Sequence, residues 1–332
     1  MQGQGVPESG QSPRFAEQGP RFSGQGPQFS GQSTEARRQM AARRGPTTMR
    51  VMLGKELRAL REKKGRSLDG GLSIEAAAKA LGFSRAKLSR IESGEIPLPK
   101  LADLKALLEE YEVTERADQE ELLQMQRDSL KSEPITSYRN YLPSGMPRYL
   151  GLERDSAAIR GYENYNVHGL LQTEDYARAQ MLSAKVVEER TTDQVQSSVR
   201  ARMARKELLD GERQVHIILT ENVLRTLIGT PEVMRGQFAE IKRLSSEKNV
   251  EVQVIPEDLP NMYRGAYNFT ILEFHEVLDP VVQSDSHKAT TMWSTESDVG
   301  FYERSFNAMA KAAPGPSYTA QILDDLEEKL WK

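Results

Sequence analysis

The chain has 332 residues, no cysteine and a net charge of −3. Its length allows two domains, and the lack of cysteine excludes disulfides and any catalytic or metal site built on a thiolate. No apolar run reaches the roughly 18 residues that span a bilayer, and the N-terminus lacks a secretory signal. We therefore expect a cytoplasmic protein that does not enter a membrane.

Charge is distributed unevenly along the chain. Residues 1–110 carry 19 Lys and Arg against 12 Asp and Glu, whereas residues 111–332 carry 26 against 36. A basic first part favours a polyanion as its partner, and the acidic second part then needs a different role. Ordinary variation in solvated surface charge explains the same numbers, so charge alone does not decide the question.

The N-terminal segment has a biased composition. Residues 1–33 are rich in Gln, Gly, Pro and Ser and repeat a seven-residue unit, as PRFAEQG, PRFSGQG and PQFSGQS. Because so few apolar side chains cannot form a core, we predict a disordered tail over residues 1–48. The tail ends in the basic arm EARRQMAARRG, which either follows DNA phosphates or is simply solvated. Another explanation of the tail is that the start codon was assigned too far upstream and that translation begins at Met40 or Met49.

Residue 49 begins a helical pattern that continues to residue 132. Leu53, Leu57 and Leu60 share one face of a first helix, which we expect to end at Gly65. Further helices are predicted over residues 74–81, 85–93, 99–111 and 115–130. These helices make residues 49–132 an all-α domain.

Two of these helices are joined by a tight turn within IEAAAKALGFSRAKLSRIESG. Ser73 is placed to cap the first of them and Ser84 the second. Gly82 can adopt the left-handed conformation that the turn needs, and Gly94 can end the second helix. This arrangement predicts a helix-turn-helix, whose second helix enters the DNA major groove.

The second helix of this motif has one apolar and one polar side. Leu88 and Ile91 point into the core, so the opposite side is exposed. Arg85 and Arg90 have the forked guanidinium that reads guanine O6 and N7, whereas Lys87 suits a phosphate. A helical hairpin with a merely solvated basic side is the alternative interpretation. The predicted DNA-binding residues are Ser84, Arg85, Ala86, Lys87, Ser89 and Arg90.

Residues 53–113 resemble the Cro/C1-repressor-like DNA-binding domain of the xenobiotic-response-element (XRE) family. The segment GFSRAKLSRIESG is similar to that family's pattern G-[VF]-S-x-[ST]-x-[LI]-S-[RK]-I-E-x-G. The family usually begins the first motif helix with a Gln that bonds a phosphate, and this chain has Ile74 there. Its loop over residues 66–72 is also longer than usual.

Prolines at 134, 143 and 147 mark a linker, which we place at residues 133–148. Helices are then expected over residues 149–165, 173–184, 193–211, 221–229, 231–247, 296–312 and 317–331. Short β-branched runs predict strands over residues 214–220, 250–256, 267–274 and 280–285. The predicted fold class is therefore α+β multidomain, with an all-α helix-turn-helix domain followed by a mixed α/β domain over residues 149–332.

The segment ENYNVHGLLQTEDYARAQM, residues 163–181, resembles a signature of the second domain of actinomycete WhiJ-type regulators. That signature usually reads P-G-L-L-Q-T-x-x-Y-A-R-A, with proline where this chain has His168. RARMARKELL, VHIILTENVLR and FTILEF are similar in the same order, so the resemblance covers most of residues 149–331. It implies a transcriptional regulator, and for some members a small protein partner encoded nearby in an antitoxin-like arrangement.

Two interpretations of GLLQT stay open. It forms either a structural turn that enters a helix capped by Thr173, or part of a site for a ligand or partner. In the second case the lining residues are His168, Gln172 and Tyr176.

Motifs of catalysis are missing from the sequence. It contains no HExxH, G-x-S-x-G, Walker or dinucleotide-binding glycine pattern. Adjacent Ser, Asp and His in SDSH do not make a triad, which is defined by spatial geometry. A metal site of His275, Asp285 and His287 is conceivable, but exposed histidines at strand ends explain the pattern more simply. We expect no enzyme, no catalytic residue, no cofactor and no metal.

Together these observations predict a sequence-specific transcriptional regulator that binds double-stranded DNA as a homodimer. We expect it to be cytoplasmic, and to be associated with the nucleoid when it is bound to DNA. Its acidic domain is expected to gate DNA binding through a small protein partner or a small-molecule effector. The alternative is an antitoxin-like protein that neutralises a small partner protein and autoregulates its own promoter.

Overall fold

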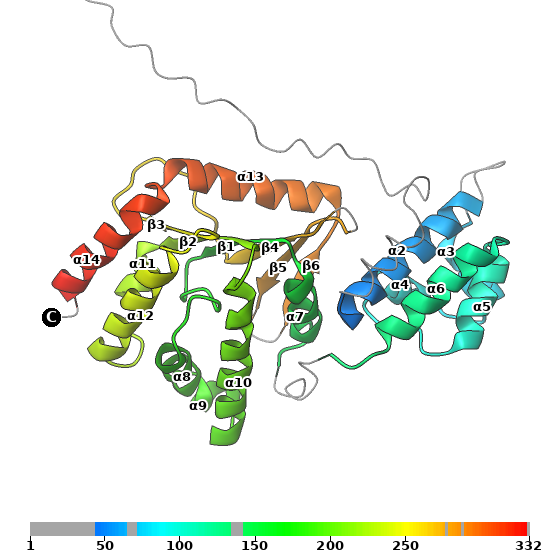
Figure 1. Cartoon of the computed structure of the whole chain (residues 1–332), viewed down its shortest axis with the longest axis horizontal. Helices are drawn as coiled ribbons and strands as arrows, with labels where there is room; N and C mark the ends of the chain where they lie inside the picture. The colour runs from blue at the N-terminus through cyan, green and yellow to red at the C-terminus, as the bar shows by residue number, and fades with distance from the viewer. Residues whose placement is uncertain (1–43, 65–71, 134–141, 276–277, 287–288, 331–332) are drawn as a thin grey trace, which may run out of the picture.

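A computed structural model describes residues 44–64, 72–133, 142–275, 278–286 and 289–330. The prediction of a disordered tail falls almost entirely outside these residues. Figure 1 shows a helical part, formed by the first five labelled helices, beside a larger part in which helices cover a sheet. The predicted fold class, an all-α domain followed by a mixed α/β domain, is confirmed.

The first domain consists of short helices around one apolar core. The helices are α2 (Pro46–Lys64), α3 (Ile74–Ala80), α4 (Arg85–Glu92), α5 (Leu101–Glu110) and α6 (Arg116–Ser129). Helix α2 begins three residues before Met49, inside the segment that was predicted to belong to the tail. Leu53 and Leu57 of α2 pack in the core with Leu88 and Ile91 of α4.

The junction between α3 and α4 has the local structure that the sequence predicts. The Ser73 hydroxyl accepts a hydrogen bond from the Ala76 N–H at 3.1 Å, and that of Ser84 accepts one from the Lys87 N–H at 3.1 Å. Gly82 in the turn has a φ of +64°. These contacts satisfy N–H groups that a helix leaves free at its start, so α4 begins at a defined residue.

The second domain contains a six-stranded mixed sheet. Its strands are β1 (Ala158–Glu163), β2 (Gln214–Thr220), β3 (Val250–Ile255), β4 (Phe269–Glu273), β5 (Val281–Asp285) and β6 (Thr290–Trp293). Their order is β3-β2-β1-β4-β5-β6, in which β1, β2 and β3 are parallel and the other pairings are antiparallel.

Helices cover both faces of this sheet. They are α7 (Met146–Asp155), α8 (Glu174–Ser183), α9 (Lys185–Glu188), α10 (Thr192–Ala204), α11 (Glu221–Arg225), α12 (Pro231–Leu244), α13 (Glu296–Ala312) and α14 (Thr319–Leu330), with 3-10 turns at Arg205–Leu209 and Pro316–Tyr318. Figure 1 shows α13 alone on one face and the other helices on the opposite face. Within the described ranges, no helix is both long and apolar enough to cross a membrane.

The prediction of one helix over residues 149–165 is wrong. Helix α7 ends at Asp155, and residues 158–163 form β1, the strand between β2 and β4. Helix-forming residues such as Ala158 hide the strand pattern, and pairing on both edges overrides that local preference. Strand β6 was also missed because it is only four residues long.

Close approach of α2 and α4 depends on a glycine. A β-carbon at Gly54 would lie 2.5 Å from the carbonyl oxygens of both Ile91 and Glu92. Such a distance is shorter than a van der Waals contact, so any side chain at residue 54 pushes α4 away from α2.

We expect Gly54→Ala to lower the free energy of unfolding by about 1–3 kcal/mol, because the added methyl overpacks the α2–α4 contact. Gly236→Ala is the matched control, since Gly236 lies within α12 with open space around its α-carbon. The control should raise stability by about 0.5–1 kcal/mol through helix propensity. Urea denaturation of the full chain measures both, and equal effects would contradict the close packing.

Candidate nucleic-acid interface

The structure brings the predicted DNA-binding residues together on one side of α4. Leu88, Ile91 and Glu92 are buried on the opposite side. The exposed side carries Ser84, Arg85, Ala86, Ser89 and Arg90, with Lys87 half-buried at its edge. Because the opposite side is buried in the core, these residues all face the solvent.

Acidic side chains lie beside both arginines of this surface. The Arg85 Nε lies 2.7 Å from the Glu75 Oε1, and the Arg90 Nε lies 2.9 Å from the Glu95 Oε1. All four side chains are about half exposed or more. Exposed ion pairs of this kind contribute little to stability, so a base edge or a phosphate can replace the carboxylates at small cost.

Lys87 points along the protein surface toward α5. Its ammonium nitrogen lies 3.4 Å from the centroid of the Phe83 ring and 3.6 Å from the Asp103 Oδ2. The cation therefore sits over an aromatic face at the edge of the exposed side of α4.

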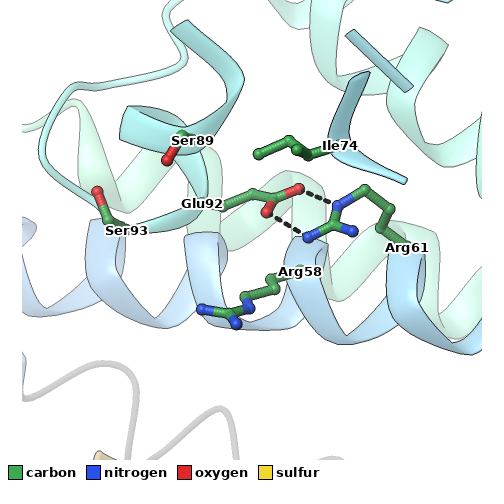
Figure 2. A pocket seen from close by; sticks show the side chains of 6 residues that line it. All are labelled: Arg58, Arg61, Ile74, Ser89, Glu92 and Ser93. Atoms are coloured by element: carbon green, nitrogen blue, oxygen red, sulfur yellow. Dashed lines mark hydrogen bonds and ion pairs between the residues drawn. The ribbon is translucent and has the colours of Figure 1, made fainter. Parts of the chain in front are cut away.

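A buried ion pair fixes α4 against α2. The Arg61 Nε and Nη2 donate to the two carboxylate oxygens of Glu92 at 2.7 and 2.8 Å (Figure 2). The Arg61 Nη1 donates to the Leu72 carbonyl at 2.9 Å. The hydrogen bonds to Glu92 are the largest cause of the raised pKa of Arg61. This pair was not predicted from the sequence, although Arg61 follows Leu53 and Leu57 at the same spacing of four.

A pocket of about 270 Å³ opens beside the exposed side of α4. Figure 2 shows its lining, to which α2 contributes Arg58 and Arg61, α3 contributes Ile74, and the end of α4 contributes Ser89, Glu92 and Ser93. Arg58 is the lining cation outside the buried pair, and its Nε donates to Glu62 at 2.8 Å on the exposed face of α2. Arg58 was not among the DNA-binding residues predicted from the sequence.

The candidate residues of the second domain, His168, Gln172 and Tyr176, are all buried. The Gln172 amide donates to the Val167 carbonyl at 2.7 Å, and the Tyr176 hydroxyl accepts from the Val167 N–H at 3.3 Å. The structure therefore groups them around one turn, where they bond backbone atoms of the chain itself. A role in binding a ligand or partner stays a prediction.

Charged groups are also buried next to this turn. The Arg205 Nε and Nη2 donate to the Glu153 carboxylate at 2.8 and 2.7 Å, and the Tyr149 hydroxyl donates to it at 2.7 Å. Burial opposes ionisation of Glu153, but the Arg205 charge and these hydrogen bonds hold its pKa below the usual value. The same burial, together with Arg205, lowers the pKa of His168 to about 3.

The residues of the conceivable metal site are not brought together. His275 follows the end of β4, whereas Asp285 is the last residue of β5. Because these strands are antiparallel, with Thr270 opposite Gln283, the two residues lie at opposite ends of the pair. His287 is outside the described residues, among which no group of three potential metal ligands occurs.

Two known families match separate parts of the chain. A helix-turn-helix domain of the Cro/C1-like, XRE type matches residues 52–122, and with it the chain is a DNA-binding regulator. A domain described as "Domain of unknown function (DUF5753)" matches residues 146–325. That match spans more than half of the sequence, so the chain belongs to the DUF5753 family, and its pairing of domains is the one seen in WhiJ-type regulators. No curated protein matches the chain.

Protonation of His168 should destabilise the fold. Its pKa is about 3 in the folded chain and about 6.5 unfolded, so between these values the unfolded chain binds the extra proton. The free energy of unfolding should therefore fall by about 2 kcal/mol from pH 7 to pH 5 through this residue. Denaturant titrations of the wild type and His168→Gln across this range measure the contribution, since nearby carboxylates affect both proteins alike. A pH dependence equal in the two would contradict it.

Proposed function

We propose that the chain is a sequence-specific, DNA-binding transcriptional regulator that reads bases with α4 in the major groove. The observation that carries this proposal is the exposed polar side of α4, held by the buried Arg61–Glu92 pair. In this proposal the second domain is regulatory and not enzymatic, and the protein acts in the cytoplasm on chromosomal DNA.

Each exposed residue of α4 has a proposed role. Arg85 and Arg90 read guanine edges after release from Glu75 and Glu95. Ser84 and Lys87 lie at the start and edge of the helix, where contact with phosphates fixes its position. Ala86 and Ser89 make close contacts with neighbouring base edges. Discrimination by each arginine should be worth about 1–3 kcal/mol.

Arg58 is proposed to supply the phosphate contact that Ile74 cannot make. Ile74 has no hydrogen-bonding side chain, and Arg58 lines the same pocket as the Ser89 and Ser93 hydroxyls. A phosphate beside this pocket would meet the exposed Arg58 guanidinium, whereas the Ser93 hydroxyl already donates to the Arg90 carbonyl at 3.2 Å. The exposed Glu62 pair holds Arg58 only weakly in the free protein.

One helix reads only a few base pairs, so we propose a homodimer on a palindromic or directly repeated site. Gating of this dimer is proposed to act through the second domain, by a small protein partner or a small-molecule effector. His168, Gln172 and Tyr176 are the proposed contact residues, and they become accessible only if the turn around Val167 opens.

Pairing of the domains in WhiJ-type regulators favours a second candidate, an antitoxin-like protein that neutralises a small partner protein and autoregulates its promoter. This candidate requires a neighbouring gene for a small protein that is toxic when expressed alone. Absence of toxicity, with DNA binding intact, would leave regulation as the main task.

The proposed function is tested by selecting duplexes from a random-sequence pool with the full-length chain. We expect an enriched motif with two half-sites. Arg90→Ala should lose about tenfold to hundredfold in affinity for the selected duplex and relax the base preference at one position per half-site. Arg178→Ala, an exposed arginine of α8 that also pairs with a glutamate, is the control. Failure to enrich any motif would contradict the function.

Arg58→Ala should weaken binding to selected and scrambled duplexes by similar factors, because a phosphate contact carries no sequence information. The slope of log affinity against log salt should become shallower by about 0.9 for each Arg58 that contacts a phosphate. Fluorescence anisotropy at four salt concentrations measures this slope. An unchanged slope would show that Arg58 does not contact DNA.

A further inference from the structure

Helix α7 lies at the start of the segment matched by the second family, although its residues 146–148 were predicted to belong to the linker, and it contacts both domains. Its Tyr149 and Leu152 pack in the large core under the sheet, together with strand residues such as Ile159. Val51 and Met52 of α2 pack against that same core from the first domain. Figure 1 shows α7 on the side of the second domain that is nearer to α2.

Arg148 of α7 bonds the end of the recognition helix. Its Nη2 donates to the Ser93 carbonyl at 2.7 Å, and Ser93 is the residue that caps the C-terminus of α4. A cation is favourable there because the last carbonyls of a helix lack partners and carry partial negative charge. Arg50 of α2 places a second cation at this helix end, since its Nε donates to the carbonyl of the next residue, Gly94, at 3.2 Å.

The other end of α7 bonds the start of α2. The Asp155 Oδ2 accepts from the Gly45 N–H at 2.6 Å, next to Pro46, the first residue of α2. A carboxylate suits this position because helix N-termini present free N–H groups and partial positive charge. Helix α7 therefore places a cation at the end of α4 and an anion at the start of α2.

Packing between these charged ends is tight. A β-carbon at Gly151 would lie 2.6 Å from both the Cβ and the Oγ1 of Thr47, a buried residue of α2. Only glycine at residue 151 lets the two helices approach this closely. This close contact between α7 and α2 brings Arg148 within hydrogen-bonding distance of the Ser93 carbonyl.

The opposite side of α7 is fixed to the second domain. The Tyr149 hydroxyl and the Arg205 guanidinium both bond Glu153, which is fully buried. Arg205 begins the 3-10 turn that follows α10. Residues adjacent on one helix thus bond the end of α4 on one side and the interior of the second domain on the other.

We propose that Arg148 is a positioning residue for DNA recognition, through which α7 lets the second domain set the position of α4. The proposal deepens the proposed function and rests on it. Arg148 acts through the Ser93 carbonyl and does not itself contact DNA. Its loss should disturb the fit of α4 to its specific bases while leaving general attraction to phosphates unchanged.

The test uses the full-length chain, the selected duplex and a scrambled duplex of equal length and composition. Arg148→Ala should lose about tenfold in affinity for the selected duplex, from removal of a charged hydrogen bond. On the scrambled duplex its affinity should stay within twofold of the wild type, with an unchanged salt slope. Arg148→Lys keeps a donor for the Ser93 carbonyl and should recover most of the loss.

Arg154→Ala is the matched control, because Arg154 is on the same helix, carries the same charge and is half exposed. It should bind both duplexes within twofold of the wild type. Titration at protein concentrations far above the dissociation constant measures the fraction of each variant that can bind DNA. A low fraction indicates misfolding, whereas an unchanged fraction with a higher dissociation constant indicates weak binding. If Arg148→Ala does not fold, Asp155→Asn takes its place and should show a smaller loss, about threefold, on the selected duplex alone.

Three outcomes distinguish the proposed function from the positioning role of Arg148. Wild-type chain that selects no motif overturns the proposed function, and the positioning role with it. If the wild type selects a motif but Arg148→Ala keeps full affinity for the selected duplex, the positioning role alone is overturned. The same holds for Asp155→Asn if that variant replaces Arg148→Ala in the test. Equal losses on both duplexes, with a shallower salt slope, would show that Arg148 contacts phosphate directly and also overturn it.

Discussion

Arg61 and Glu92 place two opposite charges out of water between α2 and α4, joined by two hydrogen bonds. Removing either partner would leave an unpaired buried charge, which typically costs about 3–5 kcal/mol. This energy penalises every arrangement in which α4 moves along or away from α2. The position of the exposed side of α4 is therefore determined by a buried contact on the opposite side of the helix.

The same principle extends into the second domain. Ion pairs and hydrogen bonds connect Ser93, Arg148, Glu153 and Arg205 across α4, α7 and the turn after α10. Apolar contacts alone would allow small sliding motions, because they have little directional preference. Bidentate and capping contacts have definite geometry, so a displacement at one end must be accommodated at the other.

Local features of the first domain could be predicted from the sequence because they are decided within a few residues. The caps at Ser73 and Ser84 and the turn at Gly82 depend on nearby backbone, and the structure has all three. Strand β1 could not be predicted, since pairing with distant β2 and β4 determines it. Arg61 and Arg148 escaped prediction for a similar reason: each acquires its role from a carbonyl or carboxylate distant in sequence. Exposure of the α4 residues followed from helical periodicity, whereas burial of His168 required the folded sheet beneath it.

Glu75 and Glu95 give the recognition surface a property that the count of basic residues hides. With Arg85 and Arg90 each beside a carboxylate, the free surface of α4 has little net positive charge to attract DNA from a distance. Encounter with DNA then gains little from electrostatic steering at this helix. In the proposed function, a duplex replaces each carboxylate with an acceptor at the right position, so random sequences should be released quickly. Selectivity would then come from the lifetime of the complex more than from the rate at which it forms.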